Sequence, residues 1–297
     1  MKRRYVRFHG MCVITLTWIF ILVSTYTWAG NEVSENTTNT NSNTYYINAP
    51  RFVRPLIEKW ITEYKKVVPE ANFAIAKSAV NKKNSKLNIL LSAHQKADQG
   101  DKTVFFAKYA ILPITARNSD AEKLIAKKVV NKKNIKKIFF EQDENNDETN
   151  QLTVYVSSSA NSIATPFAAY FGENTINYRG KRIAGDDVYL NQAVENDTKG
   201  VSINTLQNIY DLSNRQIKDG LSILIGSKNK AEVWKSIDNA ISYIEQHNAD
   251  NVDIEKIGFA YKEDNKVDEF ISWILKNGEN YNHEYGFIKL NDNEHNQ

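Results

Sequence analysis

The sequence predicts an α/β fold divided into two lobes. Segments with apolar residues at helical spacing alternate with apolar runs of strand length, an order that is typical of α/β proteins. The globular region, from Tyr45 to about Leu290, is longer than one modest hydrophobic core usually organises, which favours two lobes. No repeat of fixed period divides this length.

The chain opens with the pattern of a secretory signal peptide. Four basic residues precede an apolar run from Met11 to Trp28, and Ala29 completes a small-residue cleavage site. We therefore expect residues 1–29 to be a signal peptide and the protein to lie in the periplasm. Because the run is long for a signal core, an uncleaved N-terminal membrane anchor is the alternative. The only cysteine, Cys12, lies in this segment and follows no lipoprotein signal, so we expect neither disulfides nor a lipid anchor.

Outside this segment the charges are balanced. The predicted signal holds four of the 38 basic residues and none of the 35 acidic ones, so the remainder is close to neutral. Interspersed charges of both signs give no electrostatic footprint for nucleic acid, so no nucleic-acid partner is expected. Lysine pairs such as Lys82-Lys83 and Lys132-Lys133 are interpreted as solvated faces. Residues 30–44 are rich in Asn and Thr and predict a disordered linker.

The first part of the globular region predicts a helix and four strands, with polar loops or short helices between the later strands. A short strand at 45–47 precedes a helix that begins at Pro55, whose apolar residues recur at helical spacing until Pro69. Apolar runs of strand length follow at 73–76, 87–91 and 104–111.

The second part predicts further short elements. Helices are expected at 121–128 and 134–140, and strands at 152–156, 201–203 and 257–261, with the acidic stretch 141–148 as a surface loop. Asp186 or Asp187 is expected to cap a helix that runs through Val194, although the pair also admits a carboxylate dyad or a metal site. Apolar faces at 234–244 and 267–274 predict the last two helices, the second of which ends at Gly278.

Known catalytic motifs are missing from the sequence. There is no nucleophile elbow, no phosphate-binding P-loop and no dinucleotide fingerprint, and His94, His247, His283 and His295 are not spaced as metal ligands. We therefore predict a protein that is not an enzyme and has no cofactor and no metal.

One stretch, Val154 to Gly172, has the order strand, small-residue loop, helix. This order commonly builds an anion pocket, because free N–H groups at a helix start point outward with the positive end of the helix dipole. Thr165-Pro166 leaves the helix start open: the helix begins either at Pro166, away from the loop, or earlier, with Pro166 inside its first turn.

Several segments together resemble the periplasmic phosphate-binding proteins of ABC transporters, the PstS family, in a divergent branch. The resemblance is carried by segments in family order, namely Pro55-Leu-Ile-Glu-Lys-Trp60, Asn134-Ile-Lys-Lys-Ile-Phe-Phe140, Ala169-Tyr-Phe-Gly172, Gly180-Lys-Arg-Ile-Ala-Gly-Asp-Asp187, Gly200-Val-Ser-Ile-Asn204, Phe270-Ile-Ser-Trp-Ile-Leu and His283-Glu-Tyr-Gly-Phe287. It implies a two-lobe periplasmic binding protein (type II) fold with hinge strands. Lobe I would comprise 45–112 plus 206–297 and lobe II 113–205, with a hinge strand at Tyr109 to Ile114 and closure of the lobes around ligand.

The resemblance also implies the ligand-binding residues. In lobe II, the roles of the family's Arg-x-Asp-x-Ser-Gly-Thr loop would fall on Ser157, Ser159, Asn161, Ser162 and Ile163. Because the family's Arg and Asp are absent, neutral donors would replace a bidentate guanidinium.

In lobe I, the corresponding residues would be Arg51, Phe52 and Ser92, and the family's acidic pocket residue is replaced by Ala93. Arg51 either supplies the positive charge lost from lobe II or is an ordinary surface arginine.

Two functions follow from the sequence. The first is an envelope solute-binding protein that captures phosphate or another small oxyanion between its lobes for transport, with a membrane transporter as partner. The alternative is a binding-protein fold without a ligand, which acts as a protein-interaction or sensory subunit in the cell envelope.

Overall fold

The computed structural model describes residues 44–126, 130–141, 148–225, 232–247 and 252–291, which all belong to one compact unit. The predicted signal peptide, almost all of the linker and most of the predicted acidic loop lie outside the described residues. Within the described ranges, no helix is long and apolar enough to cross a membrane.

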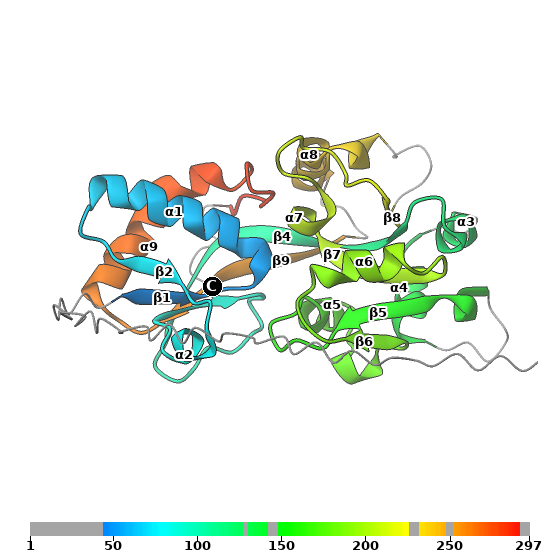
Figure 1. Ribbon diagram of the computed structural model, residues 1–297, viewed down its shortest axis with the longest axis horizontal. Coiled ribbons are helices and arrows are strands. Elements are labelled where there is room, and N and C mark those ends of the chain that lie inside the picture. Colours follow the sequence, from blue (N-terminus) through cyan, green and yellow to red (C-terminus); the bar gives the residue numbers. More distant parts are fainter. Residues whose placement is uncertain (1–43, 127–129, 142–147, 226–231, 248–251, 292–297) are drawn as a thin grey trace, which may run out of the picture. The chain divides into compact units, whose positions relative to one another are not determined.

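The described strands form one mixed nine-stranded sheet (Figure 1). Its order is β2, β1, β3, β9, β4, β7, β5 and β6, and β8 pairs with β4 outside this path. The strands are β1 (Tyr45–Asn48), β2 (Phe73–Ile75), β3 (Leu87–Leu90), β4 (Lys102–Ala116), β5 (Thr153–Ser157), β6 (Lys181–Ile183), β7 (Gly200–Thr205), β8 (Leu221–Ile223) and β9 (Asp253–Tyr261).

Helices pack against both ends of the sheet (Figure 1). They are α1 (Arg54–Val67), α2 (Ala79–Lys83), α3 (Asp120–Ile125), α4 (Lys132–Phe140), α5 (Ala164–Tyr170), α6 (Tyr189–Glu195), α7 (Leu206–Ile209), α8 (Ile237–His247) and α9 (Asn265–Asn277). We call β1, β2, β3, α1, α2 and α9 the first half, and β5, β6, β7 and α3 to α6 the second half. Each half has parallel strands at its centre, since β1 pairs in parallel with β2 and β3, and β5 with β6 and β7.

Strand β4 joins the two halves. It pairs antiparallel with β9 from Lys102 to Ile111 and antiparallel with β7 from Ile111 to Thr115. The predicted hinge strand, Tyr109 to Ile114, lies inside β4 at this exchange of partners. Pro113 falls between the end of the β9 pairing and the start of the β8 pairing at Ile114, where a missing N–H costs little.

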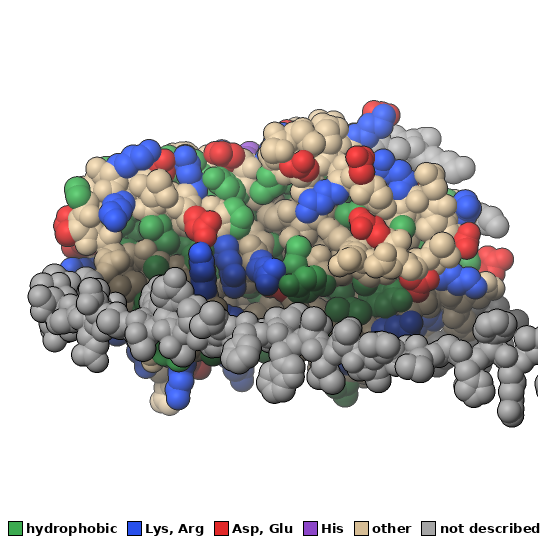
Figure 2. Space-filling view, in the orientation of Figure 1, with side chains coloured by type: hydrophobic (Ala, Val, Ile, Leu, Met, Phe, Trp, Pro, Cys, Tyr) green, Lys and Arg blue, Asp and Glu red, His purple; other side chains and the backbone are tan. Residues whose placement is uncertain are grey.

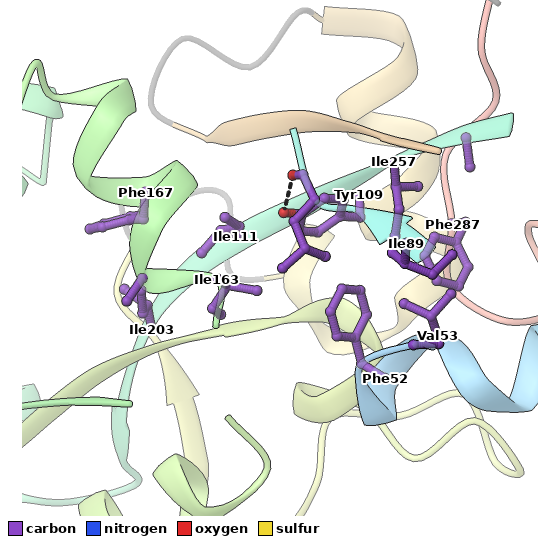
Figure 3. Packing of buried hydrophobic residues seen from close by; sticks show 14 of the residues in the cluster. Phe52, Val53, Ile89, Tyr109, Ile111, Ile163, Phe167, Ile203, Ile257 and Phe287 are labelled. Atoms are coloured by element: carbon purple, nitrogen blue, oxygen red, sulfur yellow. Dashed lines mark hydrogen bonds between the residues drawn. The ribbon is translucent and has the colours of Figure 1, made fainter. Parts of the chain in front are cut away.

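Two hydrophobic clusters lie on the two faces of β4. Tyr109 and Ile111 belong to the first cluster, which extends through α1, α9, α4 and α5, and Figure 3 shows part of it. Ala110 and Leu112 belong to the second cluster, which includes residues of α6, α7 and α8. Because successive side chains of a strand point to opposite faces, one strand supports both cores. Residues 206–247 thus contribute largely to a core that they share with α6 of the second half. The assignment of residues 206–297 to lobe I and of 113–205 to lobe II stays a prediction.

Helix α1 shows how the local sequence specifies this packing. Pro55 stands at its start, and the apolar face that repeats at helical spacing is buried through Trp60 and Tyr64. The Trp60 indole donates to the Gly278 carbonyl at 2.8 Å. Gly278 ends α9 as predicted, with a helical φ of −70°; a side chain there would lie only 2.8 Å from the Trp60 ring nitrogen, so the close approach requires glycine.

The surface carries mixed charges. On the face drawn in Figure 2, basic and acidic side chains are interspersed, apart from a short group of Lys and Arg side chains near the middle. The expectation of no nucleic-acid partner stays a prediction.

Candidate functional site

The first-half residues Phe52 and Ser92 lie close to Tyr109 of β4. The centroid of the Phe52 ring is 5.3 Å from that of Tyr109 and 6.2 Å from that of Phe287, and Figure 3 shows the Phe52 ring pointing towards Tyr109. The Tyr109 hydroxyl donates to the Leu91 carbonyl at 2.7 Å, and Ser92 follows it in the chain and is buried. Two of the three residues predicted in the first half are therefore brought together around one buried tyrosine.

The second-half loop Ser157–Ile163 follows β5 and is closed by its own hydrogen bonds. The Ser157 hydroxyl donates to the Gly185 carbonyl at 2.7 Å and accepts from the Ser159 N–H at 3.0 Å. The Ser159 hydroxyl accepts a longer bond, 3.4 Å, from the N–H of Asn161, which is exposed. These side chains mainly stabilise the loop itself.

The end of the loop binds a carboxylate, and that carboxylate is Asp187 of the same chain. The Ser162 hydroxyl donates to Asp187 Oδ1 at 2.5 Å, and the Ile163 N–H donates to Asp187 Oδ2 at 3.0 Å. The same hydroxyl accepts from the N–H of Ala164, the first residue of α5, at 3.0 Å. Asp187 thus satisfies the donors that the sequence offered to a free anion.

The prediction that Asp186 or Asp187 caps the following helix agrees with the structure for Asp186 and not for Asp187. Helix α6 has Val188 at its N-cap, whose own side chain makes no cap bond, and Asp186 Oδ1 accepts from the Val188 N–H at 3.3 Å. Asp187 instead caps α5, which precedes it in the sequence, because the β6 segment returns the chain to the α5 start. Only the tertiary structure shows which helix start lies within its reach.

The start of α5 resolves the alternatives left by Pro166. Ile163 is the N-cap and Ala164 the first helical residue, so Pro166 lies inside the first turn, where a missing N–H costs little. The helix start therefore faces the loop, as the anion-pocket order requires.

Burial governs the protonation of Asp187. The residue is 2% exposed, and burial raises the pKa of its carboxyl to about 6, despite the hydrogen bonds from Ser162 and Ile163, which lower it. The neighbouring Asp186 raises the pKa further. The Asp187 main-chain carbonyl accepts from Asn204 Nδ2 at 3.0 Å, which fixes the segment to β7.

Arg51 joins the first half to the second at the surface. Its side chain is 52% exposed, and its Nε lies 3.9 Å from Asp186 Oδ2. Its guanidinium carbon lies 5.5 Å from the centroid of the Tyr189 ring. This geometry is that of a surface ion pair with an aromatic contact, and a role of Arg51 in holding an anion stays a prediction.

Two acidic residues that sequence reasoning missed lie on β9. Asp253 is opposite Ile111 and Glu255 is opposite Tyr109 in the β4–β9 register. Asp253 is 2% exposed, and neither of its carboxylate oxygens has a hydrogen-bond partner among the described residues. The available signal was the alternation of apolar and acidic residues from Val252 to Glu255, which indicates a strand with acids on one face.

These carboxylates and Asp187 form a group around Tyr109. Burial, followed by the charges of Glu255, Asp253 and Asp187, raises the pKa of the Tyr109 hydroxyl well above its usual value. Burial likewise raises the pKa of Asp253 well above its usual value and also raises that of Glu255, which interacts with the Ser92 hydroxyl. The predicted residue Ser92 thus lies beside an acid rather than a cation.

The described residues contain no group of three or more His, Cys, Asp or Glu arranged to hold a metal ion. An open hollow of about 370 Å³ lies on the second half and includes none of the predicted site residues; it is lined by Ile183, Ala184, Tyr189, Gln192, Ala193 and Asn196. The polar groups described so far are neutral N–H and hydroxyl donors and carboxylates.

The fold is that of the type II periplasmic binding proteins, as predicted. No family model matches the chain, and no curated protein sequence matches it. Solved structures do match. One, described as a phosphate ABC transporter substrate-binding protein with bound phosphate from Clostridium perfringens, has a TM-score of 0.56 and 17% sequence identity, over 84% of this chain and 100% of that one.

Two further structures support the same fold. An ABC-type phosphate transport receptor from Vibrio cholerae has a TM-score of 0.50 and 14% identity, over 83% of this chain and 100% of that one. A full-length BenM mutant has a TM-score of 0.51 and 12% identity, over 84% of this chain and 70% of that one. The predicted resemblance to phosphate-binding proteins of the PstS type is confirmed at the level of the fold, and the low identity leaves the ligand to be argued from the residues.

Proposed function

We propose that this protein is a solute-binding protein of the cell envelope, which captures a small ligand between its two halves and delivers it to a membrane transporter. Its role is to bind rather than to catalyse. The proposal depends on one observation: residues predicted in both halves lie next to the junction at Ile111. Phe52 and Ser92 lie by Tyr109 on one side of this junction, and Ile163 lies on the other side.

Figure 3 supports this proposal. It shows Phe52 near Tyr109, and Ile163 near Ile111 with Phe167 further away, all within one cluster. In a two-lobe fold such a junction is where closure encloses a ligand, because both halves contribute to its walls.

The finer prediction is that the ligand is phosphate or another small oxyanion. The fold and the loop that precedes α5 support it. For phosphate to use the loop donors, however, it must displace the Asp187 carboxylate from Ser162 and Ile163, since those donors are already bonded. We therefore expect any phosphate binding at this loop to strengthen below pH 6, where the Asp187 carboxyl gains a proton.

A second candidate is a binding-protein fold that has no ligand and serves as a protein-interaction or sensory subunit in the envelope. The bond between Asp187 and the α5 start favours it, because the fold then needs no bound anion to satisfy this loop.

Calorimetry separates these candidates. The purified protein is titrated with phosphate and sulfate at pH 5.5 and pH 7.5, and mass spectrometry under native conditions tests for a co-purifying small molecule. Binding of any small molecule supports the solute-binding function. A protein with neither a bound molecule nor a calorimetric response at millimolar solute, but with a reproducible crosslinked envelope partner, supports the second candidate and contradicts the first.

A further inference from the structure

We infer that Asp253 and Glu255 form the binding site for a small organic cation, one that carries a primary ammonium or a guanidinium group. This inference rests on the proposed function and gives its ligand a chemical class. It assigns the recognition to β9, outside the loop that sequence comparison with phosphate-binding proteins indicates.

The two acids lie on β9 beside the part of β4 where the two halves meet. Asp253 pairs with Ile111, the residue at which β4 exchanges β9 for β7, and Glu255 pairs with Tyr109 two positions away. The acids therefore stand where the first half meets the second half, and not at the rim of either half.

The side chains of the two acids point to the same face of β9. Val252 and Ile254 pack in the second hydrophobic cluster, whereas Ile257 packs in the first. Because side chains alternate along a strand, Asp253 and Glu255 project to the same face as Ile257. This is the face on which Phe52, Tyr109 and Ile163 lie.

The buried carboxylate of Asp253 lacks a hydrogen-bond donor among the described residues. Buried polar atoms in folded proteins almost always have a hydrogen-bond partner, and a buried carboxylate without one is costly. Both oxygens of Asp253 lack such a partner within the described ranges, although the residue is 2% exposed. By contrast, Asp187, equally buried, accepts two hydrogen bonds. Asp253 therefore offers two acceptor atoms to a ligand that brings N–H donors.

The groups around Tyr109 include three acidic side chains. Asp253, Glu255 and Asp187 all act on Tyr109, and in the part of the chain that the structure describes none of the three forms an ion pair. The basic residues whose charge acts on the two β9 acids are Lys132 and His94, both exposed to solvent. In their ionised form these three acids attract a cation and repel an oxyanion.

The aromatic rings add to this preference. Phe52 and Tyr109 lie with ring centroids 5.3 Å apart on the same face as the acids. An ammonium or guanidinium group is attracted to aromatic faces as well as to carboxylates, so the two kinds of wall are complementary to the same ligand class.

The experiment is a calorimetric titration of the full-length chain with putrescine, agmatine and L-arginine, and in parallel with phosphate and sulfate. We expect at least one of the three cations to bind, and Asp253→Asn to weaken that binding about 10- to 100-fold, since a charge-assisted hydrogen bond is lost. Asp219→Asn, at a fully exposed aspartate, is the matched control and leaves the affinity unchanged.

A second readout tests the site itself. Burial raises the pKa of Asp253, and a bound cation favours its ionised form, so at a pH below that raised pKa binding releases protons. The apparent binding enthalpy then depends on the ionisation enthalpy of the buffer, and this dependence diminishes in Asp253→Asn. If that variant does not fold, Glu255→Gln provides the same comparison.

The outcomes distinguish the inference from the proposed function. Binding of phosphate or sulfate alone, or cation binding that Asp253→Asn and Glu255→Gln leave unchanged, overturns the cation site and keeps the solute-binding function. A protein that binds none of the probes and carries no co-purified small molecule overturns both.

Discussion

An aspartate is buried at the start of α5 and another at the start of β9, and the two differ in their hydrogen bonds. Asp187 at the α5 start accepts hydrogen bonds from Ser162 and Ile163 and is held by the fold. Asp253 at the β9 start accepts none among the described residues. The donors of the loop expected to bind an anion therefore already have an acceptor, whereas the acceptors without a donor among the described residues lie on β9.

Removal of the satisfied carboxylate has the largest expected effect on stability. Asp187→Ala leaves the Ile163 N–H and the Ser162 hydroxyl buried without an acceptor, and we expect the free energy of unfolding at pH 7.5 to fall by about 2 kcal/mol. Urea denaturation measures it, with Asp219→Ala, at a fully exposed aspartate, as the control. A loss of less than about 0.5 kcal/mol would contradict the capping role.

The pH dependence of stability gives the next largest effect. The pKa of Asp187 is about 6 in the fold against 3.8 as its reference, so between these values the folded state binds more protons than the unfolded state. Stability contributed by this group therefore falls as pH rises through 6, and the whole shift corresponds to about 3 kcal/mol. Between pH 5 and pH 7.5 the loss is about 1 kcal/mol.

Asp187→Asn tests this dependence, because an amide of the same shape does not titrate. Urea denaturation of both proteins at pH 5 and pH 7.5 isolates the contribution of Asp187 from all other groups. Equal pH dependence in the two proteins would show that this carboxyl has an ordinary pKa.

The unsatisfied aspartate predicts a smaller effect of truncation. Asp253→Ala breaks no hydrogen bond within the described residues, and we expect the free energy of unfolding to change by less than about 1 kcal/mol. The measurement is the same denaturation series as for Asp187→Ala. A loss equal to that of Asp187→Ala would remove the contrast between the two sites and indicate that Asp253 has a structural role.

The surface pair between the halves predicts the smallest effect. Arg51→Ala removes an exposed ion pair of 3.9 Å, which contributes about 0.5 kcal/mol or less. We expect unfolding to be nearly unchanged and phosphate affinity, if calorimetry detects any, to be unchanged as well. A marked loss of anion binding would support the prediction that Arg51 supplies the missing positive charge.

Much of the fold followed from local patterns. Helical spacing and Pro55 predicted α1, and the runs at 73–76 and 87–91 predicted β2 and β3 within a residue or two, because these signals depend on near neighbours. The run at 104–111 predicted only the middle of β4, whose 15 residues extend at both ends. Its length is set by pairing with β9 and β7, which are distant in sequence.

For the candidate site too, local patterns predicted some features, and contacts between distant residues set the others. Local patterns predicted the small-residue loop that precedes α5. That Asp187 fills this loop, and that Asp253 lacks a hydrogen-bond partner among the described residues, follows from contacts between segments far apart in the sequence. The physical reason is that hydrogen bonds and burial depend on which residues meet in space, whereas local spacing specifies only which face each residue takes.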